Sequence, residues 1–170
     1  MPSPPCPSDC DCGRHRRQTS EERFWSKVDK SGDCWLWTGH RLSGGYGQFM
    51  VKKGQRVVAH RFSYELASGP IPTGLQLDHR YTCPKNCVNP EHLRPATQKQ
   101  NSENLFGPHG HNRSSGVRGV TWVKARDKWK AQVGHNGRLH FGGEFKELSD
   151  AEAAAVELRN RLFTHNDADR

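Results

Sequence analysis

The pair Asp78-His79 and the later residue Asn101 have the side chains needed for phosphodiester hydrolysis. Asp78 and Asn101 offer a carboxylate and a side-chain carbonyl, which are the oxygen ligands that Mg²⁺ or Mn²⁺ prefers. An imidazole with an ordinary pKa can take a proton from an attacking water, so His79 is the candidate general base. Each residue alone is common in turns, but together the three predict a catalytic site with a divalent cation that stabilises the phosphate.

Three residues directly after this pair have the order C-x3-C-x4-H, and they are Cys83, Cys87 and His92. Zinc takes four ligands in a tetrahedron, so one more must come from elsewhere. Cys34 is the main candidate because a strand that begins there can lie beside the loop, and His40 or His60 could replace it. We therefore expect a structural zinc ion, against the alternative of unligated thiols in a loop.

Residues 1–20 contain a second group of ligand-type side chains, which are Cys6, Cys10, Cys12 and His15. Their close spacing predicts another structural zinc site, although incidental cysteines in a disordered tail are the alternative. No signal peptide is visible, so clustered cysteines indicate metal ligands rather than disulfides. For the same reason we expect a cytoplasmic protein.

The composition restricts the classes of function. The chain has 170 residues, a formal net charge of +8 and a pI of about 9.4. Few aliphatic residues and a high charge favour disorder, but five Trp residues and metal clusters can hold small domains together. No apolar run is long enough to span a membrane. The positive charge favours nucleic acid as the partner and gives no indication of a membrane partner.

The elements that must position the catalytic residues are short. Alternation and Gly-rich turns predict strands over residues 34–37, 46–51, 55–59 and 75–79 and a helix over residues 61–67. Thr97 and Gln100 have the spacing of a capping box, which predicts that a helix carrying Asn101 begins there. A strand therefore ends at Asp78-His79, and a helix follows the Cys-rich loop.

Residues 105–116 are rich in Gly, Pro and Ser and predict a linker before three strands and a helix. Period-two alternation predicts one apolar face, made of Val120, Trp122, Trp129, Ala131, Val133, Leu139 and Phe141. It predicts an opposite face made of Thr121, Val123, Lys130, Gln132, Arg138 and His140. Asn136-Gly137 indicates a hairpin turn. Ser149 and Glu152 indicate a capping box before a helix whose apolar stripe is Ala151, Ala154, Ala155, Leu158 and Leu162.

The stretch LDHRYTCPKNCVNPEHLRPATQKQNSEN over residues 77–104 resembles the HNH, or His-Me finger, nucleases. It is most similar to the Cys-rich subset related to the His-Cys box homing endonucleases. The upstream motifs DCWLWTG, GGYGQF and AHRFSYEL are similar to phage-type HNH proteins. By position, the resemblance implies that His79 is the general base, Asn101 a metal-binding residue and His92 a zinc ligand.

The same resemblance implies further roles. Asp78 is similar to the carboxylate metal ligand of intron-encoded HNH nickases, and Asn89 is implied to brace the loop. The family also implies an arginine near the scissile phosphate. Arg56 is the first choice for that role and Arg61 the second.

The pattern RGVTWV, KWKAQV, GRLHFGGEF and AAAVEL over residues 116–164 resembles an AP2/ERF DNA-binding domain, with a small insertion near Gly142-Gly143. In that family a three-stranded sheet enters the major groove. The resemblance implies DNA contacts at the matching positions, which are Arg118, Thr121, Val123, Lys130, Gln132, Arg138 and His140. Plant members have arginines where Thr121 and Val123 stand, so looser sequence recognition is implied.

Together these observations predict an α+β protein. A small zinc-stapled ββα-metal (His-Me finger) nuclease domain would precede a three-stranded antiparallel sheet packed on one helix. The expected segments are a Cys/His-rich segment (1–20), a nuclease domain (21–104), a linker (105–116) and an AP2/ERF-like domain (117–170).

The predicted function is that of a site-specific, homing-type endonuclease that depends on Mg²⁺ or Mn²⁺ and cuts double-stranded DNA in a bacterial or phage-infected cell. A non-cleaving AP2-type transcriptional regulator is the alternative, and a nonspecific nuclease or nickase is a third interpretation. The sequence shows no clear dimer interface, so the oligomeric state stays open.

Overall fold

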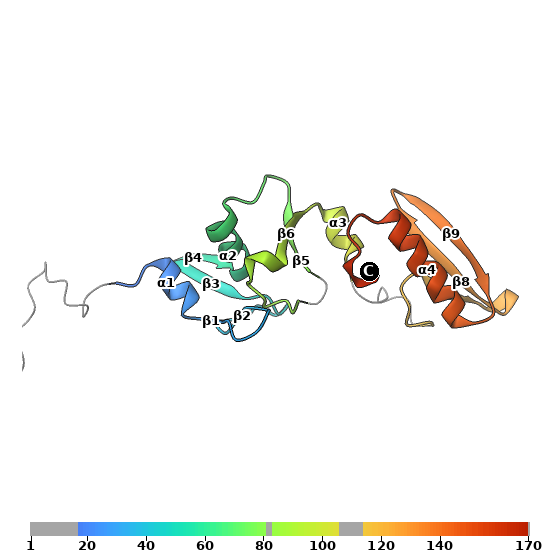
Figure 1. Cartoon of the computed structure of the whole chain (residues 1–170), viewed down its shortest axis with the longest axis horizontal. Coiled ribbons are helices and arrows are strands. Elements are labelled where there is room, and N and C mark those ends of the chain that lie inside the picture. Colours follow the sequence, from blue (N-terminus) through green and yellow to red (C-terminus); the bar gives the residue numbers. More distant parts are fainter. Residues whose placement is uncertain (1–16, 81–82, 106–113, 170) are drawn as a thin grey trace, which may run out of the picture.

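The computed structural model describes residues 17–80, 83–105 and 114–169. The predicted zinc cluster of Cys6, Cys10, Cys12 and His15 and most of the predicted linker lie outside these residues. Figure 1 shows two units, an N-terminal unit that ends with helix α3 and a C-terminal unit that contains the sheet of β8 and β9 with helix α4. Each unit has its own buried apolar cluster.

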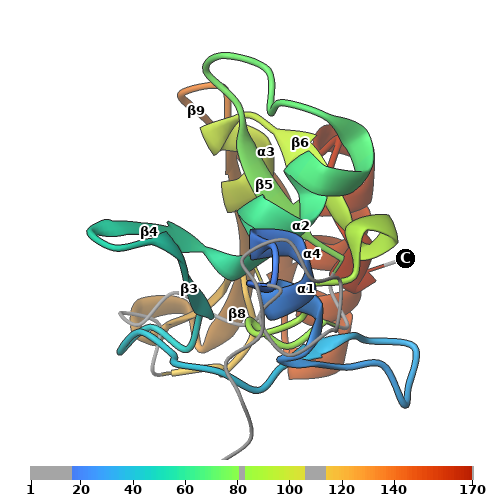
Figure 2. The ribbon, with the colours of Figure 1, turned by 90° about the vertical axis from the view of Figure 1, so that its left-hand side faces the viewer.

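The N-terminal unit begins with a helix and two small hairpins: α1 (Ser20–Trp25), β1 (Val28–Asp29), β2 (Leu36–Trp37), β3 (Gln48–Lys52), β4 (Gln55–Val58) and α2 (Ala59–Ser68). Strand β1 pairs with β2 and β3 pairs with β4, both antiparallel. Figure 2 shows that the β3–β4 hairpin projects from the body of the molecule. The core residues of this unit are Phe24, Trp37, Phe49, Ala59 and Val88. Gly47 is required here because a Cβ on it would lie 2.5 Å from Cδ1 of Trp37.

A hairpin and a helix complete this unit. They consist of β5 (Gln76–His79), the 3-10 turn η1 (Pro90–His92), β6 (Leu93–Ala96) and α3 (Gln98–Glu103). Strands β5 and β6 are antiparallel, with Asp78 opposite Arg94. The predicted capping box is confirmed, because the Thr97 side chain accepts from the Gln100 N–H and the Gln100 side chain accepts from the Thr97 N–H.

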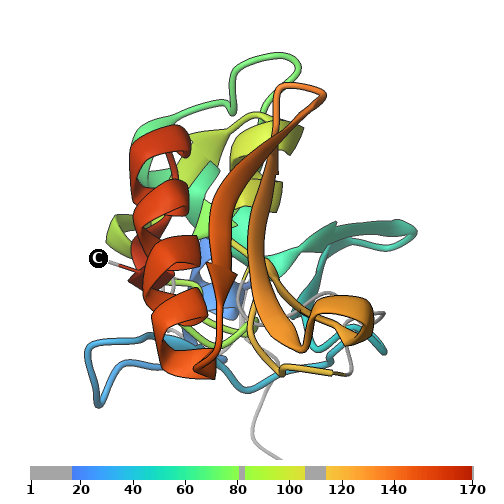
Figure 3. The same cartoon turned by 90° about the vertical axis from the view of Figure 1, so that its right-hand side faces the viewer.

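The C-terminal unit is a sheet in the order β7-β8-β9 covered by one helix (Figure 3). Its elements are β7 (Val120–Val123), η2 (Lys124–Arg126), β8 (Lys128–His135), β9 (Arg138–Phe145), α4 (Leu148–Leu162) and η3 (Asp167–Asp169). Asn136 and Gly137 form the predicted turn, with φ values of 51° and 73°. The predicted capping box at Ser149 is wrong, because α4 already begins at Leu148 and Glu147 occupies the cap without a side-chain hydrogen bond.

The predicted faces of β9 are also wrong, because this strand contains a bulge. Ala131 pairs with Gly143, but the next residue of β8, Gln132, pairs with Phe141, so Gly142 is an extra residue. Such a slip reverses the faces of the residues on one side of it. Leu139 and Phe141 therefore lie on the face away from α4 and are 73% and 62% exposed, whereas Arg138 and His140 take the other face.

Helix α4 packs where the predicted alanine stripe lies. Ala151, Ala155 and Leu158 are buried, and Val120 and Ala131 of the sheet lie against the two alanines. The predicted core role of the two tryptophans holds only in part. Trp129 is half-buried against this cluster. Trp122 meets the Trp129 ring edge to face with ring centroids 4.8 Å apart but remains 37% exposed. In the described ranges, no helix has the length and apolar character that crossing a membrane requires.

Candidate active site and metal centre

Backbone pairing brings Cys34 to the Cys-rich loop, as the sequence predicts. The backbone N–H of Trp37 donates to the carbonyl of Asn86 at 2.9 Å, and the backbone N–H of Val88 donates to the carbonyl of Trp35 at 2.7 Å. The chain after Cys34 is therefore bound to the loop as an additional short strand. Ser63 of α2 supports the same loop by donating to the carbonyl of Val88 at 2.5 Å.

The four predicted zinc ligands converge: the ligand atoms of Cys34, Cys83, Cys87 and His92 all lie within 4.8 Å of one another. We call these residues the metal cluster. The Sγ atoms of Cys34 and Cys83 are 3.7 Å apart, and Nδ1 of His92 lies 3.3 to 3.7 Å from the three sulfurs. Tetrahedral zinc with ordinary bond lengths separates its ligand atoms by about 3.5–3.8 Å, so the spacing fits a structural zinc ion.

The surroundings of the metal cluster support a bound cation. Burial raises the pKa of the Cys83 thiol and of the Cys87 thiol, and the neighbouring Cys34 raises both pKa values further. Three adjacent thiolates are therefore unfavourable unless a cation compensates them. Nε2 of His92 lies 3.4 Å from Oδ2 of Asp33, on the side of the ring where second-layer carboxylates lie at zinc sites. Asn89 braces the loop by donating to the carbonyl of Asp33 at 2.9 Å.

His79, the predicted general base, lies at the end of β5 against the loop of the metal cluster. Its Nε2 is 3.0 Å from the carbonyl oxygen of Cys87. A carbonyl only accepts, so the neutral ring carries its proton on Nε2 and keeps the lone pair on Nδ1. Burial lowers the pKa of His79, which favours this neutral form. The metal cluster thus fixes the carbonyl that orients the base.

Two further aromatic residues surround His79. The rings of His60 and His79 meet edge to face with centroids 5.0 Å apart. The centroid of the Tyr46 ring lies 5.5 Å from that of His60 and 6.2 Å from that of His79. Burial lowers the pKa of His60 to about 3, so this ring is neutral. The sequence interpretation offered His60 only as a substitute zinc ligand, and the structure places it beside the candidate base instead.

Asp78 and His79 point to opposite faces of β5, as alternation requires. Asp78 is 6% exposed, and its Oδ2 accepts from Nη2 of Arg94 at 3.1 Å and from Nδ2 of Asn104 at 2.9 Å. Asn104 also donates to the backbone carbonyl of His79 at 3.1 Å. Arg94 and Asn104 thus hold the end of β5, a role that the sequence analysis missed.

Asn101 lies on α3 and contacts the start of β5 rather than its end. Its Nδ2 donates to Oε1 of Gln76 at 3.1 Å, which leaves its carbonyl oxygen as an acceptor. Gln76 and Asp78 share a face of the strand, so Asn101 lies on the Asp78 side. Among the described contacts, none joins Asn101 directly to Asp78 or His79.

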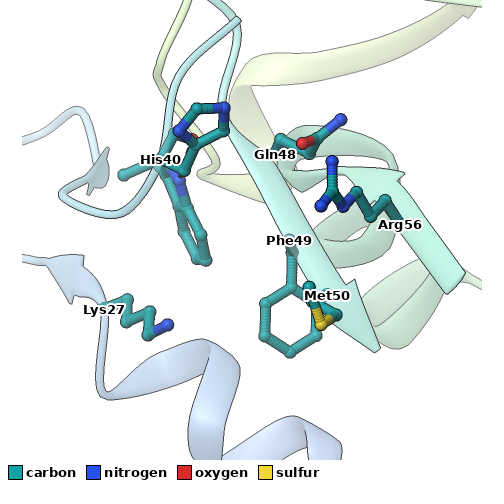
Figure 4. A pocket seen from close by; sticks show the side chains of 7 residues that line it. Lys27, His40, Gln48, Phe49, Met50 and Arg56 are labelled. Carbon is teal, nitrogen blue, oxygen red and sulfur yellow. Dashed lines mark hydrogen bonds between the residues drawn. The ribbon is translucent and has the colours of Figure 1, made fainter. Parts of the chain in front are cut away.

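The structure separates the two candidate arginines. Arg56 is exposed on β4 and lines a groove of about 280 Å³ together with His40, Gln48 and Met50 (Figure 4). Arg61 is exposed in the first turn of α2, next to His60. Arg61 is therefore adjacent to a residue that touches His79, whereas in the described part of the chain no contact joins Arg56 to His79.

Comparison with known proteins finds a family match over this part of the chain. A family model described as HNH endonuclease matches residues 57–103, which contain His60, Asp78, His79 and Asn101. Protein 3.8 of Escherichia phage T7 is 34% identical over 102 residues, which are 60% of this chain and 79% of that protein. The chain belongs to the same family as Protein 3.8 and contains an HNH endonuclease domain.

Two other phage T7 proteins are similar to this HNH protein. Protein 7.7 is 44% identical over 73 residues, 43% of this chain, and Protein 2.8 is 38% identical over 80 residues, 46% of this chain. The matched part spans about half the length of these two relatives, 55% and 52%. No solved structure matches the chain. The matched HNH endonuclease domain indicates nuclease activity, which acts on nucleic acid.

The C-terminal unit of this HNH protein presents four of the seven predicted DNA-contacting positions on the face away from α4. We call this face, which also carries Leu139 and Phe141, the outer face; the four positions are Thr121, Val123, Lys130 and Gln132. Arg138 is exposed beside the hairpin turn. His140 lies on the opposite face of the sheet together with His135, and the centroids of their two rings are 6.2 Å apart.

Arg118 lies elsewhere than the sequence predicts. Its guanidinium donates to the carbonyls at the end of α3, those of Ser102, Glu103 and Leu105, at 2.6 to 3.0 Å. It also lies over the ring of Phe163 at 5.3 Å. A cation at the end of a helix satisfies carbonyls that lack partners. Arg118 thus joins the two units and is not part of the outer face.

Proposed function

We propose that this HNH protein is a metal-dependent endonuclease that hydrolyses phosphodiester bonds of double-stranded DNA. The observation that carries the proposal is the orientation of His79. Its Nε2 is occupied by the carbonyl of Cys87, so the basic Nδ1 is the atom left for a water molecule. Nδ1 takes a proton from that water as it attacks phosphorus, and the 3′ oxygen leaves.

The donor chemistry of Asp78 and Asn101 suits a hard cation. Oδ2 of Asp78 is used by Arg94 and Asn104, and Nδ2 of Asn101 by Gln76, so each residue keeps one oxygen for a ligand. We propose these two oxygens as ligands of Mg²⁺ or Mn²⁺, which would supply positive charge to the phosphate when bound. We prefer Arg61 to Arg56 for a phosphate contact, because it follows His60 and its charge lowers the pKa of that ring.

We further propose that the outer face of the C-terminal sheet binds DNA in the manner of an AP2/ERF-like domain and directs cleavage to particular sites, as in a homing-type enzyme. Lys130 supplies charge on this face, and Leu139 and Phe141 supply exposed apolar surface. Apolar groups in the major groove contact the methyl group of thymine. Because the relatives are proteins of phage T7, we propose that the enzyme acts in a phage-infected bacterial cell.

Replacing Lys130 by alanine tests the outer face. If Lys130 contacts a phosphate, the variant binds all sequences more weakly and the slope of log K against log salt falls by about one. Affinity is measured by fluorescence anisotropy with a duplex at several salt concentrations. The matched control is Arg161→Ala, which removes an exposed cation from α4. Equal losses in both variants would argue against a specific role of this face.

The alternative function is that of a DNA-binding regulator that does not cleave. Plasmid incubated with the pure protein and Mg²⁺ separates the two, with EDTA as the control. We expect open-circular or linear plasmid in the presence of Mg²⁺ and intact supercoils in EDTA. Retarded but uncut plasmid under both conditions would favour the regulator, and the ratio of open-circular to linear product distinguishes a nickase from an enzyme that cuts both strands.

A further inference from the structure

The chain returns to the N-terminal unit after α4. Figure 1 shows residues 163–169 passing between α4 and α3. Thr164 donates from its backbone N–H and its hydroxyl to Oε2 of Glu103 at 3.1 and 3.2 Å. Asp167 donates its backbone N–H to Oδ1 of Asn104 at 3.1 Å. We call residues 163–169 the returning segment.

The returning segment also reaches the carboxylate of Asp78 through a shared arginine. Both oxygens of Asp167 accept from Arg94, at 2.6 and 3.2 Å, in a two-point ion pair. The same guanidinium donates to Oδ2 of Asp78 at 3.1 and 3.3 Å. A paired, planar guanidinium of this kind fixes geometry as well as charge.

Asp167 is therefore linked to both members of the Asp78-His79 pair through a single intervening residue. Through Arg94 it reaches the side chain of Asp78. Through Asn104 it reaches the same carboxylate at 2.9 Å and the backbone carbonyl of His79 at 3.1 Å. Two separate paths thus connect the returning segment with the end of β5.

The other side of the returning segment is held by the C-terminal unit. Asp169 accepts from Nε and Nη2 of Arg159 at 2.5 and 2.9 Å, and Asn166 donates to Oδ1 of Asn160 at 3.0 Å. Arg159 and Asn160 belong to α4, which packs on the sheet. A displacement of that sheet would therefore be transmitted through α4 to the returning segment.

We propose that Asp167 is a positioning residue for cleavage. Its carboxylate acts through Arg94 and its backbone N–H through Asn104, and both hold the end of β5 in its catalytic arrangement. The same contacts couple that end to the C-terminal unit. This inference rests on the proposed nuclease function. Outer-layer partners of a catalytic carboxylate set its orientation, and their loss commonly reduces activity 10–100-fold.

The test compares Asp167→Asn with Asp167→Glu and with the control Asp150→Asn, which changes an exposed acid in the first turn of α4. For plasmid cleavage we expect Asp167→Asn to lower kcat about tenfold with KM unchanged, because DNA binding is left intact. Asp167→Glu keeps the carboxylate and restores most of the rate. Asp150→Asn cleaves like the wild type.

A second measurement does not depend on cleavage. In ¹H–¹⁵N spectra, the side-chain amide of Asn104 and the backbone amide of His79 should shift in Asp167→Asn and not in Asp150→Asn. A wild-type kcat in Asp167→Asn, or a loss of zinc and of folded structure along with the rate, overturns the proposal. If the wild-type protein fails to cleave, the nuclease proposal fails and the resonances decide: unchanged Asn104 and His79 signals overturn the positioning role as well.

Discussion

Replacing His79 by alanine is expected to lower the rate of DNA cleavage by roughly 10²–10⁴-fold, the usual contribution of a general base. The reason is geometric. Nε2 of His79 is bound to the carbonyl of Cys87, so the substitution removes Nδ1, the atom that we propose takes the proton from water. Single-turnover cleavage at saturating DNA measures this effect, since binding no longer limits the rate.

The interpretation of that variant requires that it remains folded. His79 touches the loop of the metal cluster, so zinc content and circular dichroism of His79→Ala must match the wild type. Its affinity for DNA should also be unchanged within about twofold, because a neutral imidazole adds little to phosphate binding. A folded, zinc-loaded His79→Ala that cleaves at the wild-type rate would exclude His79 as the base.

Replacing Cys87 by serine is expected to unfold the nuclease part of the chain rather than slow it. A structural zinc contributes about 10–16 kcal/mol in small zinc-binding peptides, which matches the 5–15 kcal/mol total stability of an ordinary domain. Cys87 is completely buried, and its carbonyl and thiol hold the base and the metal cluster. Native mass spectrometry should show the loss of one zinc ion.

The C-terminal unit serves as an internal reference for this variant, because its core of Val120, Ala131, Ala151 and Ala155 is separate from the metal cluster. Its amide resonances should stay dispersed while those of the N-terminal unit collapse. Lys85→Ser, an exposed change in the same loop, should keep both the metal and the fold. A Cys87→Ser protein without metal but with a folded N-terminal unit would refute the structural role of zinc.

The metal cluster was predictable from the sequence because the ligand types and their spacing follow from zinc chemistry alone. Even the distant ligand, Cys34, could be named, since few other cysteines were available and a strand could carry it to the loop. Arg94 and Asn104 could not be named in this way. Their roles depend on the β5–β6 register and on the end of α3, which place them against Asp78.

Errors in the predicted fold have local causes. The alternation of residues 138–141 is regular, but the extra residue Gly142 reverses the faces of the preceding part of β9. A Cβ on Gly142 would lie 2.8 Å from Leu158, so this glycine also lets α4 approach the sheet. Arg118 was misplaced for a different reason: its partners, the carbonyls at the end of α3, belong to the other unit.

The most direct test of the account is cleavage of a labelled DNA duplex with Mg²⁺ in water enriched in ¹⁸O. If the Nδ1 atom of His79 activates water for attack on phosphorus, the wild-type product carries one ¹⁸O atom on its new 5′ phosphate. His79→Ala should yield almost none of this product in the same time. An intact duplex, a product phosphate without ¹⁸O, or equal ¹⁸O-labelled product from both proteins would contradict the account.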